Sequence, residues 1–197
     1  MADLIFYAGA MGSSKTAHAL MTKFQYTERG KKVWLIKPAT DTREPFKTEN
    51  GVCLALVKSR IGIEAWAEVI YPEDHINIKA PITANTIICD EAQFLTVDQV
   101  DELKMIADSR NIEVFCYGLK TDFTTHLFPG SKRLLELASK TIELPVICDC
   151  GNKAVVNARI LNNSIVAEGE LIDIGGDEKY KAFCYACWKR KLAGGSI

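Results

Sequence analysis

The sequence predicts an α/β protein with a mostly parallel sheet, followed by a small C-terminal region of a different kind. Three observations indicate this. Strand patterns alternate with helix patterns up to about residue 145, a glycine-containing loop separates the first strand from the first helix, and cysteines, glycines and short strand-like runs dominate after Pro145. Alternating strands and helices imply βαβ units, which bind ligands at the carboxyl ends of their parallel strands.

The elements of the first half follow from apolar runs and their ends. An apolar strand is expected at residues 3–8 and a helix at 15–29, which Gly30 would terminate. Further apolar runs predict strands at 32–38, 52–57 and 85–90. Pro38 stops the second strand, and the polar stretch after it carries no predicted element.

The second half continues the alternation as far as the expected boundary near residue 145. A helix is predicted at 96–111, because Thr96 is a suitable N-cap and apolar residues recur on one face of the run. The remaining predicted elements are a strand at 112–119, a helix at 131–140, and strands at 154–161 and 164–174. We therefore expect two domains, 1–145 and 146–197.

Length, charge and hydropathy exclude several classes of protein. A chain of 197 residues with 48% apolar residues can bury a proper core. A net charge of -1 argues against a nucleic-acid partner, because proteins that bind the phosphate backbone carry a basic excess. No run approaches the roughly 20 apolar residues that span a bilayer, and the N-terminus is acidic where a signal peptide would be basic. We expect a cytoplasmic protein without a membrane partner.

The stretch GAMGSSKT, which begins at Gly9, has nearly the spacing of a phosphate-binding loop. Such a loop aims backbone N–H groups at phosphates, while its lysine reaches the outer phosphates and its Ser or Thr binds magnesium. Lys15 and Thr16 fill those positions, and Gly12 allows close approach of the backbone. Ser14 replaces the usual second glycine, which costs energy if its φ is positive. The loop predicts a P-loop NTPase-like core, against the alternative of a turn without a ligand.

Two adjacent acids, Asp90 and Glu91, end the apolar run NTIIC. In nucleotide-binding folds, an acid at the end of a second buried strand holds magnesium, and its neighbour faces the reacting groups and can take a proton. The alternative is a pair of exposed acids that cap the following helix. A phosphate loop in the same chain favours the first interpretation.

Seven cysteines divide into two kinds. Cys53, Cys89 and Cys116 are isolated in apolar runs and are expected to be small buried hydrophobes. The other four form a C-x-C pair and a C-x-x-C pair, and their thiolates suit a closed tetrahedral zinc site. These residues are Cys148, Cys150, Cys184 and Cys187.

Four further stretches, taken together, resemble the type II (cytosolic tetrameric) thymidine kinases. They are DEAQFL after the apolar run, KPATDTR, YGLKTDF and the tail IGGDEKYKAFCYAC. The resemblance covers the chain in order from about residue 3 to 189. Two features depart from the family pattern: Ser14 in the phosphate loop, and C-x-C where C-x-x-C is commoner.

The resemblance implies a kinase that transfers the γ-phosphoryl group of ATP to the 5′-hydroxyl of thymidine or deoxyuridine in pyrimidine deoxynucleotide salvage. Glu91 would be the general base, and Thr16 and Asp90 would handle Mg²⁺. Asp41 would lie near the 5′ end of the nucleoside, and Arg43 near the phosphates. The residues that would hold ATP are Gly9, Ala10, Met11, Gly12, Ser13, Ser14, Lys15, Thr16 and Arg43.

The resemblance also implies a nucleoside pocket and a lasso that closes over it. Asn157 stands where the family commonly has threonine and would shape the pocket for the thymine methyl group. The lasso backbone would read the base edge. The implied nucleoside-binding residues are Met11, Asp41, Phe94, Leu119, Phe123, Phe128, Asn157, Leu171, Ile172, Asp173, Ile174 and Tyr180. Residues 1–145 would then be the ATP-binding domain, and 146–197 the zinc-stabilised lasso domain.

Family members are usually homotetramers and are commonly inhibited by thymidine triphosphate, and we expect both here by resemblance. Three other interpretations stay open. DEAQ also resembles a helicase motif of nucleic-acid motors, although this chain is short for two motor domains. A zinc-ribbon binding module with a vestigial loop, and a kinase of another nucleoside, are the others.

Overall fold

The computed structural model describes residues 2–40, 45–161, 164–166 and 179–194. Its helices and strands, in chain order, are β1 (Leu4–Ala8), α1 (Lys15–Glu28), β2 (Val33–Pro38), β3 (Phe46–Glu49), β4 (Val52–Lys58), β5 (Glu64–Ile70), α2 (Ile76–Lys79), β6 (Thr86–Cys89), the 3-10 helix η1 (Ala92–Phe94), α3 (Val97–Arg110), β7 (Glu113–Gly118), α4 (Pro129–Leu137), β8 (Lys140–Glu143), β9 (Val156–Leu161), β10 (Ser164–Val166), β11 (Tyr180–Phe183) and α5 (Tyr185–Leu192).

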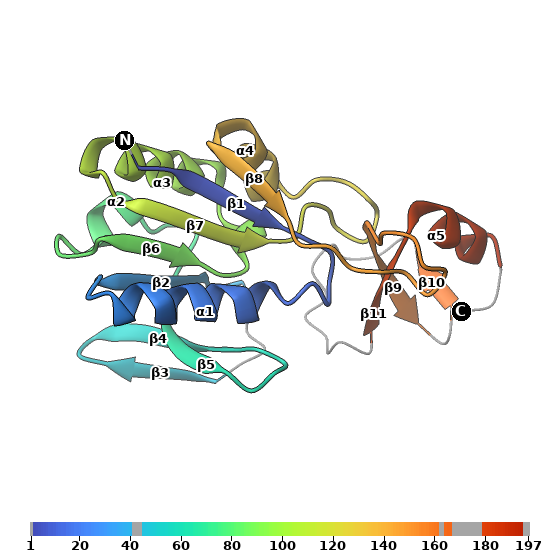
Figure 1. Ribbon diagram of the computed structural model, residues 1–197, viewed down its shortest axis with the longest axis horizontal. Helices are drawn as coiled ribbons and strands as arrows, with labels where there is room; N and C mark the ends of the chain where they lie inside the picture. Colours follow the sequence, from blue (N-terminus) through green and yellow to red (C-terminus); the bar gives the residue numbers. More distant parts are fainter. Residues whose placement is uncertain (1, 41–44, 162–163, 167–178, 195–197) are drawn as a thin grey trace.

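The main sheet has eight strands in the order β3-β4-β5-β2-β6-β7-β1-β8. The six strands from β5 to β8 in this order pair in parallel, and only the β3–β4–β5 edge is antiparallel. This arrangement confirms the predicted mostly parallel α/β fold. Figure 1 shows β1, β6 and β7 pointing toward the C-terminal part of the chain.

Helices cover both faces of the main sheet (Figure 1). On one face, Leu20 of α1 packs with Leu35, Ile88 and Tyr117 of the strands. On the other, the apolar sides of α3 and α4 pack against alternate strand residues, among them Phe6 of β1. Because both faces are buried there, the central strands β2, β6 and β7 form continuous apolar runs, which is why they could be recognised in the sequence.

Helix α3 begins as the sequence predicts. The Thr96 hydroxyl accepts a hydrogen bond from the N–H of Gln99, and the Gln99 side chain accepts one from the N–H of Thr96 in return. This capping box satisfies two backbone donors at the helix start. Within the described residues, no helix has the length and apolar character needed to cross a membrane.

The C-terminal part has its own small sheet, in the order β10-β9-β11, and the helix α5. A separate apolar cluster forms its core, including Val156, Ile165, Phe183 and Trp188 together with three of the paired cysteines. The change of architecture falls near the expected boundary at residue 145. The assignment of separate functions to 1–145 and 146–197 stays a prediction.

Several elements differ from those expected. The run 131–140 does not form one helix, because α4 ends at Leu137 and the chain enters the edge strand β8 at Lys140. The polar stretch after Pro38 contains β3, a short edge strand that needs no apolar run, since most of its residues face water. The strand expected at 164–174 is described only as far as Val166, where β10 ends.

Candidate active site

The phosphate loop connects β1 to α1, as the motif predicts. Its backbone takes positive φ angles at Gly12 (82°) and at Ser14 (59°), and α1 starts at the next residue, Lys15. The Lys15 ammonium donates to the carbonyl oxygens of Gly9 and Ala10 at 3.1 and 2.9 Å. It also contacts the Ser13 hydroxyl at 3.1 Å. The loop is thus wrapped around its own lysine.

Ser14 occupies the left-handed region, with φ 59° and ψ 26°. Only glycine takes this conformation without a steric cost from Cβ. The Ser14 side chain makes no capping hydrogen bond to α1. Position 14 is therefore strained by the serine, and the hydroxyl does not compensate through the helix.

Thr16 and Asp90 join the phosphate loop to the carboxylate pair. The Thr16 side chain lies close enough to Asp90 to favour its ionised form, and the Asp90 side chain is almost fully buried at the end of β6. Burial and then the charge of Glu91 raise the pKa of Asp90 to about 7, while Thr16 and the charge of Lys37 act in the opposite direction. Lys37 and Thr16 thus offset only part of the cost of burying the ionised carboxylate.

This charge deficit fits a divalent cation. Magnesium prefers hard oxygen ligands and is commonly held by one or two carboxylates together with substrate phosphates. Asp90 and Thr16 offer a carboxylate and a hydroxyl next to the phosphate loop. The donor set therefore suits Mg²⁺, as the sequence predicts, although the identity of the ion stays a prediction.

Glu91 lies one residue further along and precedes η1. Its backbone is left-handed, with φ 52°, and its side chain is only partly buried. Its carboxylate accepts a hydrogen bond from the Gln93 amide at 2.6 Å. Adjacent acids thus have different surroundings: Asp90 faces Thr16 and the protein interior, whereas Glu91 is accessible from the site.

Of the seven predicted nucleoside residues that the structure describes, five lie on or next to the loops around this end of the sheet. The rings of Phe94 and Phe128 meet edge to face, with centroids 5.6 Å apart. Leu119 follows β7, and Met11 belongs to the phosphate loop; these four side chains are half-buried. Phe123 differs, because it is fully buried and the Arg159 guanidinium covers its ring at 5.6 Å.

Asn157, on β9, connects the small sheet to the phosphate loop. Its Oδ1 accepts a hydrogen bond from the N–H of Met11 at 2.7 Å, and its Nδ2 donates to the carbonyl of Thr121 at 3.2 Å. The residue is buried. Its amide therefore bonds to two backbone groups of the protein, a role that the sequence did not reveal. Tyr180, half-buried on β11, pairs with Arg159 on the same small sheet.

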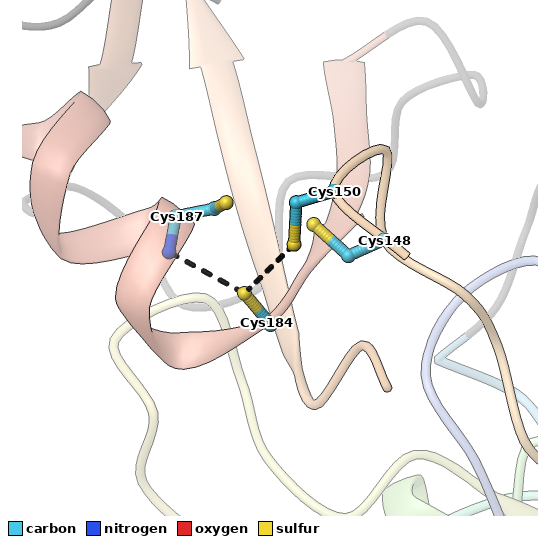
Figure 2. A group of neighbouring side chains, drawn as sticks. All are labelled: Cys148, Cys150, Cys184 and Cys187. Carbon is cyan, nitrogen blue, oxygen red and sulfur yellow. Dashed lines mark hydrogen bonds between the residues drawn. The ribbon is translucent and has the colours of Figure 1, made fainter. Parts of the chain in front are cut away.

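The four paired cysteines converge, as Figure 2 shows. Their sulfur atoms all lie within 4.8 Å of one another, and the Sγ atoms of Cys150 and Cys184 are 3.6 Å apart. Tetrahedral zinc with Zn–S bonds of about 2.3 Å separates its sulfur ligands by roughly 3.8 Å, so the cluster fits such an ion. Gly151, with φ 85°, turns the chain after the C-x-C pair. A four-thiolate set leaves no open position for catalysis.

The sequence analysis missed two side chains near the carboxylates, Lys37 and Gln93. Lys37 is buried in β2, and its charge favours the ionised form of Asp90. A lysine inside the otherwise apolar run VWLIKP is the signal that could have drawn attention to it. Six predicted site residues lie outside the described residues: Asp41, Arg43, Leu171, Ile172, Asp173 and Ile174.

The parallel sheet, the phosphate loop after β1 and the carboxylate pair after β6 define a P-loop NTPase-like protein. Residues 2–188 match the family model described as thymidine kinase. The chain belongs to the thymidine kinase family.

Thymidine kinases from several organisms are similar in sequence to this chain over nearly its whole length. The thymidine kinase of Legionella pneumophila (strain Lens) is 42% identical over 98% of this chain and 92% of that protein. That of Zymomonas mobilis is 40% identical over 98% of each chain, and that of Enterobacteria phage T4 is 42% identical over 95% and 96%. Among solved structures, the large terminase of a thermophilic bacteriophage in complex with ADP covers 73% of this chain and 40% of its own, with a TM-score of 0.45 and 11% identity.

Proposed function

We propose that this chain is an ATP:thymidine 5′-phosphotransferase, which transfers the γ-phosphoryl group of ATP to the 5′-hydroxyl of thymidine or deoxyuridine. The observation that carries the proposal is that Thr16, at the start of α1, stands beside the buried Asp90 and favours its ionised form. This proximity brings the phosphate loop and the carboxylate pair into one site, in a chain of the thymidine kinase family.

ATP binds with its phosphates against the loop amides that run from Gly9 to Thr16. Lys15 leaves some of its contacts with loop carbonyls and reaches the outer phosphates, where its charge has a stronger partner. Asp90 and Thr16 would hold Mg²⁺, which would supply positive charge beside the phosphates. Asp41 and Arg43 are proposed near the 5′ end and the phosphates from the family resemblance alone.

Glu91 is the proposed general base. Its carboxylate takes the proton of the 5′-hydroxyl as that oxygen bonds to the γ-phosphorus. The bond between the γ-phosphorus and the β–γ bridging oxygen breaks, and ADP leaves with that electron pair. The difference in surroundings between the two acids supports this division of roles, because the accessible Glu91 can meet a substrate hydroxyl and the buried Asp90 cannot.

The nucleoside lies against the half-buried side chains beside the phosphate loop: Met11, Phe94, Leu119, Phe128 and Tyr180. Aromatic and apolar walls with a few polar groups are typical of sites for flat, neutral bases. Phe123 is fully buried, so we propose that it supports the pocket and does not touch the base. The backbone of residues 171–174 is proposed to read the base edge and to close the site.

Zinc held by the four cysteines ties the two ends of that lasso together. The apolar core of the C-terminal part is small, so metal binding supplies much of its folding energy. Closure of the lasso excludes water and limits wasteful hydrolysis of ATP. This assigns ATP binding to 1–145 and nucleoside closure to 146–197.

Thymidine triphosphate is the proposed feedback inhibitor. Its base fits the thymidine pocket, and its phosphates run back toward Lys15 and the loop amides, so that one molecule blocks both substrates. Inhibition that saturating thymidine relieves agrees with this mode, whereas inhibition that thymidine leaves untouched contradicts it. A homotetramer in the cytoplasm that serves pyrimidine deoxynucleotide salvage completes the proposal, on the family resemblance.

The experiment incubates the protein with γ-labelled ATP, Mg²⁺ and a panel of nucleosides, and separates the products. Labelled thymidine monophosphate is the expected product. Label on another nucleoside with none on thymidine identifies a different nucleoside kinase, and labelled phosphate stimulated by nucleic acid identifies a motor. The absence of any transfer by folded protein favours the binding module and contradicts the proposal.

A further inference from the structure

Gln93 is a buried glutamine between the proposed base and the nucleoside wall. Only 2% of its surface is exposed. Its Nε2 lies 2.6 Å from Oε2 of Glu91, and its Oε1 accepts a hydrogen bond from the N–H of Leu119 at 3.0 Å. One side chain thus joins the turn after β6 to the end of β7.

The chemistry of these partners fixes the orientation of the amide. The backbone N–H of Leu119 can only donate, so the Gln93 oxygen must face it. The amide nitrogen must then face Glu91 and donate to it. A donor at 2.6 Å from a carboxylate oxygen forms a charge-assisted hydrogen bond, which is stronger than a bond between neutral groups. Gln93 therefore restricts the rotation of the Glu91 carboxylate.

The neighbouring backbone approaches Gln93 closely. A Cβ on Gly118 would stand 2.7 Å from the Gln93 Oε1 and 3.0 Å from its backbone nitrogen. On the opposite side, a Cβ on Gly130 of α4 would stand 2.5 Å from the carbonyl oxygen of Leu95 and 3.0 Å from that of Gln93. Two glycines therefore let β7 and α4 hold the turn tightly from both sides.

We propose that Gln93 is a positioning residue for the phosphoryl transfer, which sets the angle at which Glu91 meets the 5′-hydroxyl. This inference rests on the proposed role of Glu91. Because the same amide holds the backbone of Leu119, which is part of the proposed nucleoside wall, it also fixes the Glu91 carboxylate relative to the nucleoside pocket. Small errors in such geometry reduce turnover strongly.

The decisive variant is Gln93→Glu, which keeps the size of the side chain and an oxygen for Leu119 but presents a carboxylate oxygen to Glu91. A hydrogen bond to a charged group contributes about 1.5–3 kcal/mol, so kcat should fall roughly 10- to 100-fold. The KM for thymidine should change by less than about threefold, since Gln93 is buried and its bond to the proposed wall residue Leu119 is to the backbone. Gln93→Met, which lacks both polar groups, should also lose kcat.

The matched control is Gln99→Glu. Gln99 is equally buried, and its amide nitrogen donates to the carbonyl oxygens of Tyr71 and Asp74, away from Glu91. This variant should lower the thermal midpoint while kcat stays within about twofold of the wild type. An equal loss of kcat in the Gln99 variant would mean that turnover follows general stability, which overturns the proposal.

A double-mutant cycle separates this inference from the proposed function. If Gln93 acts through Glu91, its substitution should cost little further turnover once Glu91→Gln is present. If Gln93→Glu proves unfolded in a thermal melt, Gln93→Met enters the same cycle. Full additivity, or wild-type kcat in folded Gln93 variants, overturns the positioning role alone. A wild-type protein that makes no thymidine monophosphate overturns the proposed function instead.

Discussion

The side-chain amide of Asn157 accepts a hydrogen bond from the N–H of Met11 at 2.7 Å and so links β9 to the phosphate loop. Its other end donates to the carbonyl of Thr121. One residue of the small sheet therefore fixes two loops of the main sheet at the proposed substrate site. Both loops carry residues of the proposed nucleoside pocket.

Asn157→Leu should weaken this connection. It leaves the Met11 N–H without its acceptor, and an unsatisfied buried group costs about 1–3 kcal/mol. The thermal midpoint should fall by roughly 2–10 °C for a chain of this size, and the KM for thymidine should rise. Asn85→Ala is the control, because Asn85 is exposed and accepts from Lys32 far from the site. An unchanged melt and an unchanged KM in Asn157→Leu would show that the link is not needed.

Ser14→Gly should stabilise the protein and preserve turnover. Its φ of 59° is costly for serine and free of cost for glycine, so we expect a gain of about 1 kcal/mol or less. Thermal melts and the dependence of activity on ATP are measured for the wild type, for Ser14→Gly and for the control variant Ser13→Gly. Ser13 is buried and contacts Lys15, so that control should lose stability. A collapse of activity in Ser14→Gly would mean that the hydroxyl is required.

Asp90→Asn should stabilise the metal-free protein increasingly as the pH rises from about 4 to about 7. The folded-state pKa of Asp90 is about 7, above the value of about 3.9 for an unfolded chain. Between these values the folded state binds the extra proton, so wild-type stability falls as pH rises from about 4 to 7. Asparagine does not titrate, so the variant should not lose stability in this way as the pH rises.

The test of Asp90→Asn compares melts of the variant and the wild type at about pH 5 and about pH 8 without Mg²⁺. The advantage of the variant should be clearly larger at the higher pH. Asp98→Asn, at an exposed position in the first turn of α3, should show no such advantage. An equal difference at both pH values would contradict the buried, uncompensated carboxylate.

Removal of metal should damage the C-terminal part before the main sheet. Cys187→Ser should lose one zinc per chain and weaken thymidine binding, while most helical signal and some ATP affinity remain, because α1, α3 and α4 belong to the main core. Cys53→Ser, in β4 and outside the cluster, should keep its zinc. Elemental analysis measures the zinc content of each variant, and nucleoside titration measures its affinity for thymidine. Metal-free protein with normal thymidine affinity would refute a required zinc site.

The main fold could be predicted because its central strands, such as β2, β6 and β7, are buried on both faces and therefore form continuous apolar runs. Strand β5 was not predicted, because it does not form a continuous apolar run. Its sequence EAWAEVI includes Glu68, whose carboxylate accepts a hydrogen bond from the Trp34 indole at 2.7 Å. Polar residues in that strand find their partner only in the folded sheet, so the sequence alone does not distinguish them from a surface loop.

In the candidate site, too, the sequence predicts local motifs but not contacts between distant parts of the chain. The phosphate loop, the carboxylate pair and the cysteine pairs are local patterns, whose chemistry follows from their spacing. The contributions of Gln93 and Asn157 are not local, since the partners of each come from distant parts of the chain. Only the packing of β7 and β9 beside the phosphate loop brings them together.

Glu91→Gln tests the central claim most directly, by rapid measurement of thymidine monophosphate formation from ATP beside calorimetric binding of thymidine. Loss of a general base should reduce turnover by roughly 10²- to 10⁴-fold, while thymidine affinity stays close to that of the wild type. A folded variant that keeps more than half of the wild-type rate would contradict the role of Glu91 as the base for phosphoryl transfer.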